Sequence, residues 1–153
     1  MERNLKMRTI KALLCLFMSS LFTIAAHADD YQGVSVRNVL TSTVAANGQK
    51  LSYLKTDNPE VSAMVVEIPP HGETGWHTHA VPVYAYMLAG RLTVEMEGGK
   101  KYEFKEGAAI FEVKDTPHNG RNYSDQTARL IVFYTGETGK PNVTRLGDRG
   151  ILE

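Results

Sequence analysis

Three histidines of this chain have the spacing of metal ligands. His77 and His79 are separated by a single residue, and alternate residues of an extended strand point to the same face. Two imidazoles can therefore converge on one ion while Thr78 faces away. His118 stands about forty residues further on, directly after Pro117, at the predicted start of another strand. Because neutral imidazole is a common ligand for Zn, Fe, Cu and Ni, these three residues predict a metal site.

Glu112 is a carboxylate whose position leaves two interpretations open. It lies six residues before His118, on a predicted strand where alternation gives it the same face as Ile110 and the opposite face from Phe111 and Val113. In the first interpretation it is an ordinary solvated strand residue. In the second it points inward, where it ligates the ion, orients a histidine or acts as a general base. A carboxylate directed to bulk water, far from the histidines, would exclude the second interpretation.

The elements that must position these residues read as strands. No long stretch has the 3.6-residue apolar period of a helix, and short β-branched or aromatic runs alternate with turn residues instead. The predicted strands are 34–40, 50–55, 61–68, 75–79, 83–88, 91–97, 100–104, 108–113, 118–123 and 128–134. Asn47 with Gly48 marks a turn, Gly98 with Gly99 marks a tight hairpin, and the tail after Gly136 is predicted to be a surface segment. So many short strands favour a sandwich or barrel, of which the jelly roll is one form.

Composition bounds the possible functions. The 153 residues carry 17 basic and 17 acidic side chains, and 42% of them are hydrophobic. This length is typical of one domain. The balanced charge argues against a nucleic-acid binder, which would show a basic excess. The ordinary apolar content argues against a wholly disordered chain.

Residues 1–28 have the pattern of a secretory signal peptide. Arg3, Lys6, Arg8 and Lys11 form a basic start, an apolar run from position 12 to position 26 follows, and the sequence Ala-His-Ala ends at Ala28. The apolar run is shorter than the roughly 20 residues that span a membrane. We therefore expect cleavage after Ala28, a single mature domain over residues 29–153, and a periplasmic or secreted location. That mature chain has no cysteine, so no disulfide can stabilise it.

One segment around the paired histidines resembles the first motif of the cupin family. Gly72 is followed after four residues by His77 and His79, and then by Gly90. The cupin motif also carries a glutamate ligand, which would fall at position 83. This chain has Val83 there, and no Asp or Glu stands between His79 and Gly90.

A second segment resembles the second cupin motif, in which a glycine, a proline, another glycine, a histidine and an asparagine follow at fixed intervals. Gly107, His118 and Asn122 stand in register with that motif, whereas Val113 and Asp115 replace its proline and second glycine. The two motifs occur in the expected order, and the resemblance extends over roughly residues 61–134.

The resemblance implies a cupin double-stranded β-helix, an all-β jelly-roll barrel. It further implies a divalent metal on His77, His79 and His118, with Fe(II) favoured and Zn, Mn, Ni or Cu also permitted by three imidazoles. The implied activity is oxygenase-like, as in a dioxygenase, on a small metal-chelating substrate. In the inward interpretation drawn from strand alternation, Glu112 is the catalytic carboxylate that positions or deprotonates that substrate. Cupins of this size also imply a homodimer, and nothing indicates a nucleic-acid partner, or a membrane partner once the signal is removed.

Other functions stay open at this point. The barrel can be a non-catalytic module that binds a metal or small ligand, or an isomerase or epimerase that transfers protons without redox chemistry. Because the usual glutamate is replaced by Val83, the site can also have lost its metal. An inward Glu112 together with open metal positions would favour an enzyme, and a pocket closed by bulky apolar side chains would favour a binding or structural role.

Overall fold

The computed structural model describes residues 33–147, so the predicted signal peptide over residues 1–28 lies outside the described part of the chain. The chain divides into two units, Met1–Val36 and Arg37–Glu153, and the second unit carries the site. Its described residues form nine strands: β1 (Pro59–Ile68), β2 (His77–Thr78), β3 (Val83–Ala89), β4 (Arg91–Met96), β5 (Lys101–Lys105), β6 (Ala109–Phe111), β7 (His118–Arg121), β8 (Ala128–Glu137) and β9 (Thr144–Arg145). None of the residues described here forms a helix with the length and hydropathy of a membrane-spanning segment.

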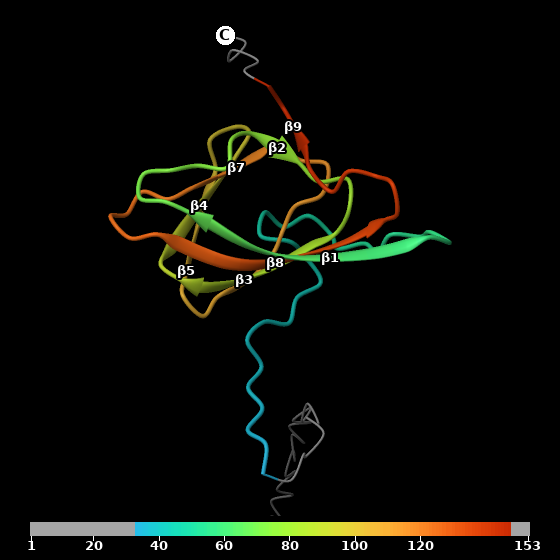
Figure 1. Cartoon of the computed structure of the whole chain (residues 1–153), viewed down its shortest axis with the longest axis horizontal. Coiled ribbons are helices and arrows are strands. Elements are labelled where there is room, and N and C mark those ends of the chain that lie inside the picture. Colours follow the sequence, from blue (N-terminus) through green and yellow to red (C-terminus); the bar gives the residue numbers. More distant parts are fainter. Residues whose placement is uncertain (1–32, 148–153) are drawn as a thin grey trace, which may run out of the picture. The chain divides into compact units, whose positions relative to one another are not determined.

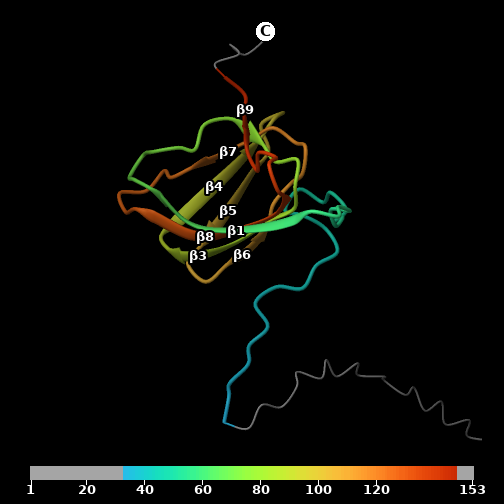
Figure 2. The same ribbon diagram turned by 45° about the vertical axis from the view of Figure 1, so that its right-hand side comes forward.

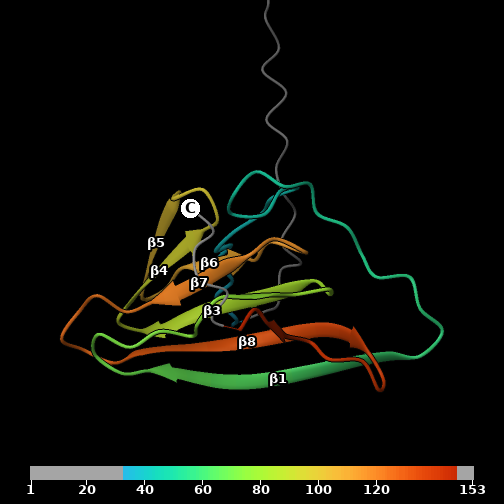
Figure 3. The same cartoon turned by 90° about the horizontal axis from the view of Figure 1, so that it is seen from above.

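These strands form two antiparallel sheets. One sheet has the order β1-β8-β3-β6 and the other has the order β5-β4-β7-β2-β9. In Figure 1 the strands β1, β8 and β3 lie below β2, β4 and β7. In the view from above, β1, β8 and β3 lie on one side of β4, β5 and β7 (Figure 3). Figure 2 shows β6 beside β3 at the edge of the first sheet. The all-β class predicted from the sequence is therefore confirmed.

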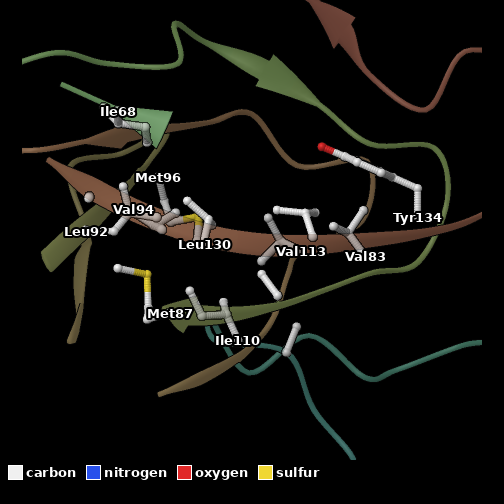
Figure 4. Packing of buried hydrophobic residues seen from close by; sticks show 14 of the residues in the cluster. Ile68, Val83, Met87, Leu92, Val94, Met96, Ile110, Val113, Leu130 and Tyr134 are labelled. Carbon is white, nitrogen blue, oxygen red and sulfur yellow. The ribbon is translucent and has the colours of Figure 1, made fainter. Parts of the chain in front are cut away.

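The core lies between the sheets because the strands alternate apolar and polar residues. In β8 the side chains of Ala128, Leu130, Val132 and Tyr134 are buried, and the residues between them are more exposed. The other large contributors, drawn in Figure 4, are Ile68, Val83, Met87, Leu92, Val94, Met96, Ile110 and Val113. Tyr134 is the polar end of this cluster, with its hydroxyl oxygen at one side of the apolar residues.

The hairpin predicted at Gly98 and Gly99 is present and joins β4 to β5. Both glycines have positive φ angles, 84° and 82°, as a two-residue hairpin turn of the type common between twisted strands requires. The amide of Met96 donates to the carbonyl of Lys100 at 2.8 Å and closes the turn. This hairpin extends the sheet that carries His118, since β7 pairs with the other edge of β4.

Two strand predictions near the start of the described region are wrong. The structure shows no strand over residues 34–40, and the segment 50–55 contributes only an isolated bridge between Lys50 and Val44. β-branched residues favour a strand only where a neighbouring strand can accept their backbone hydrogen bonds. Within the described chain, Val34, Val36 and Val39 are exposed instead.

The tail after Gly136 is mostly exposed, as predicted, but it also contributes a strand. β8 continues to Glu137, and after an exposed stretch the chain returns as β9, which pairs with β2. The return brings residue 142 against the interior, where a Cβ added to Gly136 would lie 2.5 Å from the Asn142 Oδ1 atom. The absence of a side chain at Gly136 thus allows the tail to pack close to β8.

Candidate metal centre

The three predicted histidines meet in the interior of the second unit. In the antiparallel pairing of β2 with β7, His77 lies directly opposite His118, and His79 follows the end of β2. All three are buried, with exposed fractions of 8%, 2% and 3% for His77, His79 and His118. One ring nitrogen from each lies within 4.8 Å of the others. Three buried histidines that can hold one metal ion are therefore present.

The orientation of each ring is set by a hydrogen bond on its far side. Each Nδ1 atom faces a backbone carbonyl oxygen, at 2.7 Å for His77 with Gly75, 3.0 Å for His79 with Asn142 and 2.8 Å for His118 with Thr116. A carbonyl oxygen can only accept, so in the neutral ring the proton sits on Nδ1 and the lone pair stays on Nε2. The same arrangement of outer hydrogen bonds orients histidines in known metal sites.

Glu112 points into this cluster from the opposite sheet. It follows β6, and its amide donates to the carbonyl of Val83 at 3.0 Å, which continues the pairing of β6 with β3. Its Oε2 atom lies 3.1 Å from His79 Nε2 and 3.4 Å from His118 Nε2, and the side chain is only 15% exposed. The carboxylate is thus directed at the histidines and away from bulk water, and the solvated interpretation is excluded.

The charges at this point suit a cation. Burial lowers the pKa of His77 to about 4, against the opposing effect of the Gly75 carbonyl, so this ring is neutral at physiological pH. Burial alone would raise the pKa of Glu112, but His118 and His79, which in their protonated forms can donate to the carboxylate and carry positive charge, outweigh burial and lower the pKa to about 2.

The donor set therefore presents nitrogen lone pairs and an ionised carboxylate to one another. The buried Nε2 of His118 has no hydrogen-bond partner among the described residues. Acceptors that face each other in a buried site are unfavourable unless a proton or a cation lies between them. The residues present therefore fit a divalent metal ion, for which imidazole nitrogen and carboxylate oxygen are suitable ligands.

The loop before β2 is held in place by a polar network around the buried Asn119. Asn119 is 2% exposed, and its Nδ2 donates to Glu73 Oε2 at 2.7 Å. The hydroxyl of Thr74 accepts from the amide of Gly120 at 2.9 Å and lies 3.3 Å from Asn119 Oδ1. These contacts fix the segment whose Gly75 carbonyl orients His77.

The structure brings together the four residues predicted to form the site, His77, His79, His118 and Glu112. His71 is not part of this cluster. His71 lies on the surface with its Nε2 3.0 Å from an oxygen of Asp125, as expected for a loop residue. Sequence reasoning missed Tyr134, whose ring centroid lies 5.6 Å from that of His79. Its alternation with Val132 and Leu130 on β8 marked the inner face and is the signal that would have found it.

The carbonyls of Gly75, Thr116 and Asn142 were also missed. A backbone carbonyl has no residue-specific signature, so only the folded chain reveals which three of them orient the histidines.

Comparison with solved structures finds similar folds. The DMSP lyase DddQ from Ruegeria pomeroyi DSS-3 aligns with 24% identity and a TM-score of 0.52 over 60% of this chain and 45% of that protein. The polyketide cyclase RemF from Streptomyces resistomycificus aligns with 27% identity and a TM-score of 0.50 over 58% of this chain and 61% of the cyclase. The chain thus covers less than two-thirds of either protein.

A cupin domain protein from Bordetella pertussis Tohama I is matched over 98% of its length, with 23% identity and a TM-score of 0.46 over 63% of this chain. A comparison with curated protein sequences finds no match. A scan against protein families matches residues 64–134 to the family described as the cupin domain. That match contains His77, His79, His118 and Glu112, and residues 64–134 of this chain are therefore a cupin domain.

Proposed function

We propose that this domain binds one divalent metal ion through His77, His79, His118 and Glu112, and that it is an oxygenase-like enzyme acting on a small metal-chelating substrate. The observation that carries the proposal is the convergence of three Nε2 lone pairs and one carboxylate, with each Nδ1 committed to a backbone carbonyl. Such a set, if it served only the fold, would leave acceptors in conflict inside the protein.

Glu112 has two roles in this proposal. Its carboxylate supplies the negative charge that three neutral imidazoles lack, which lowers the net charge of a bound divalent ion. Its side chain lines the pocket beside the histidines. It can therefore also accept a proton from a substrate held there. A divalent ion at this site supplies a Lewis acid and, as Fe(II), a redox centre for reactions that consume O2.

Metal content is the direct test of the binding half of the proposal. Protein isolated from its own compartment is expected to carry close to one equivalent of a divalent metal, and His118→Ala is expected to carry much less. His71→Ala is the matched control, because His71 is exposed and paired with Asp125 away from the cluster. Equal metal content in wild type and His118→Ala would contradict the proposal. Since copper and zinc bind such sites tightly whatever the native ion is, the metal must be measured before any chelation step.

Oxygen uptake tests the catalytic half. Apoprotein loaded anaerobically with Fe(II) is mixed with a panel of chelating substrates, and O2 consumption and product are measured together. Uptake that depends on substrate and is lost in His77→Ala supports an oxygenase. Metal binding without turnover of any substrate would favour the non-catalytic binding module instead, and turnover without O2 consumption would favour an isomerase or epimerase.

The location of the domain is part of the same proposal. The basic start, apolar run and Ala-His-Ala sequence of residues 1–28 support export with cleavage after Ala28. Mass spectrometry of the protein from its host compartment is expected to find a chain beginning at Asp29. A chain that retains residues 1–28 in the cytoplasm would contradict export.

A further inference from the structure

The pocket beside the donor set has an uncharged, aliphatic wall. Besides the histidines and Glu112, it is lined by inward side chains of both sheets, namely Val66, Ile68, Leu92, Val94, Leu130 and Val132. No lysine or arginine lines it among the described residues. Within the described chain, Glu112 is the only acidic residue in its lining.

The polar groups on this wall are neutral hydroxyls. Thr74 uses its hydroxyl within the protein, in contacts with Gly75 and Asn119. Tyr134 is buried, lines the pocket, and its hydroxyl makes no hydrogen bond with any residue that the structure describes. As a phenol, this group can donate one hydrogen bond.

The pocket is small. Its volume is about 60 Å³, less than half of the roughly 150 Å³ of an apolar protein cavity that holds benzene. A group that enters it completely is therefore smaller than an aromatic ring. The space suits the head of an aliphatic molecule, with methyl or methylene groups against the wall and two oxygens towards the histidines.

The geometry points to a substrate class: a short aliphatic chelator that carries at most one negative charge and places apolar groups against this wall, with Tyr134 donating to one of its oxygens. A small dicarboxylate is disfavoured because its second carboxylate would lie against aliphatic side chains and near Glu112 without a cationic partner. This inference rests on the proposed metal site and adds the selection by charge.

Acetylacetone and malonate form a matched pair of probes. Both chelate a metal through 1,3-related oxygens, but malonate has charged oxygens where acetylacetone has methyl groups. Their dissociation constants are measured on Co(II)-loaded protein through the visible spectrum of the ion, and on aqueous Co(II) as the reference. The ratio of the malonate to the acetylacetone dissociation constant is expected to be at least about tenfold higher on the protein than on the free ion. The reason is that malonate would bring an unpaired charge into an apolar site.

Two substitutions at one position test whether the wall makes the selection. Val66 lines the pocket, is only half-buried and tolerates a longer side chain better than the deeper residues do. Val66→Lys is expected to strengthen malonate binding about tenfold relative to Val66→Met, which has a similar shape without the charge. Tyr134→Phe is expected to weaken acetylacetone binding about fivefold, the usual loss for one neutral hydrogen bond, with the Co(II) spectrum of the ligand-free protein unchanged.

The outcomes separate this inference from the function on which it rests. If Co(II) gives no protein-bound spectrum, the metal site itself fails and this inference fails with it. If Co(II) binds but malonate is favoured as strongly as by the free ion, the metal site stands and the proposed substrate class is wrong. Equal malonate affinity in the folded Val66→Lys and Val66→Met proteins would also overturn the assignment of the wall.

Discussion

Replacing Glu112 with glutamine is expected to change the stability of the apoprotein and its metal affinity in opposite directions. In metal-free protein the carboxylate faces the Nε2 atoms of His79 and His118 at 3.1 Å and 3.4 Å. The Nδ1 protons of both rings are committed to carbonyls, so acceptor faces acceptor. The amide group of glutamine has the same shape and supplies an N–H donor, which would satisfy a buried lone pair.

The magnitude follows from these contacts. A hydrogen bond gained by a buried acceptor is worth about 1 kcal/mol, and in a domain of this size that raises Tm by about 4 °C. Metal affinity is expected to fall at least about 100-fold, because even outer-sphere partners of metal ligands contribute roughly 10- to 100-fold. Calorimetry of apoprotein at mildly alkaline pH gives the first quantity, and competition with a fluorescent chelator gives the second.

The control is Glu97→Gln, on an exposed residue outside the site, which is expected to change neither quantity. If the Glu112→Gln protein were less stable without metal and equally tight with it, Glu112 would be a partner of protonated histidines rather than a metal ligand. That single result would refute the reasoning from donors and acceptors.

The remaining predictions concern acid stability, the tail and self-association. The pKa of His77 is 6.5 in the unfolded chain and about 4 in the fold, so between these pH values the unfolded state binds more protons. As the pH falls from 6.5 to 4, the apoprotein is therefore expected to lose up to about 3 kcal/mol of its free energy of unfolding. Urea unfolding measures this loss. Gly136→Ala places a Cβ 2.5 Å from Asn142 Oδ1 and is expected to weaken metal binding severalfold, since the Asn142 carbonyl orients His79. Val65, which is 56% exposed on the outer face of β1, is expected to lie in a homodimer interface, so Val65→Glu should give monomers in light scattering.

Each of these has a result that would count against it. A pH slope that persists unchanged in apo His77→Gln would assign the acid sensitivity to other groups. Full metal affinity in a folded Gly136→Ala protein would mean that the tail carbonyl is dispensable. A wild-type protein that is monomeric at high concentration would remove the homodimer, and Glu60→Gln, on the same strand, is the control for a general effect of altered charge there.

Strands whose apolar residues alternate towards the core could be predicted from the sequence. Strands that exist only through pairing with a segment far away in the chain could not. Strands β3 and β8 followed directly from alternating residues, and the Gly98 turn followed from its backbone requirement. The segment 34–40 has equally strong β-propensity but no strand, because propensity alone supplies no partner for its hydrogen bonds. Conversely, β9 is too short to show a period and exists only because β2 offers an edge.

The candidate site could be predicted to the extent that it consists of side chains at strand spacing. His77 and His79 follow from alternation, and their approach to His118 follows from the motif resemblance. The inward direction of Glu112 was one of two open interpretations, and it depends on β6 pairing with β3 in one register: a shift by a single residue would have turned the carboxylate outward. The carbonyl that orients His79 comes from the tail, which no local pattern connects to the site.

The register of β6 and β3 also explains how the domain can lack the usual cupin glutamate and keep a carboxylate. Tyr84 pairs with Phe111, so in an antiparallel ladder Val83 lies opposite Glu112, with both side chains on the inner face. Directly opposed side chains have Cβ atoms about 5 Å apart, which is within the reach of a glutamate. In the proposed metal site the carboxylate would therefore come from the neighbouring strand, at the position opposite the one where the family motif has its glutamate.

An exchange of the two residues tests this equivalence. Glu112→Val is expected to lower metal affinity at least as much as Glu112→Gln, and the double variant Val83→Glu with Glu112→Val is expected to recover a large part of the loss, because the charge returns to the same face. Val83→Glu alone would place two carboxylates side by side and lower the stability of the apoprotein. If the double variant folds, as judged by cooperative unfolding, and binds metal no better than Glu112→Val, then position 112 has a geometry that the opposite strand cannot reproduce, and the two positions are not interchangeable.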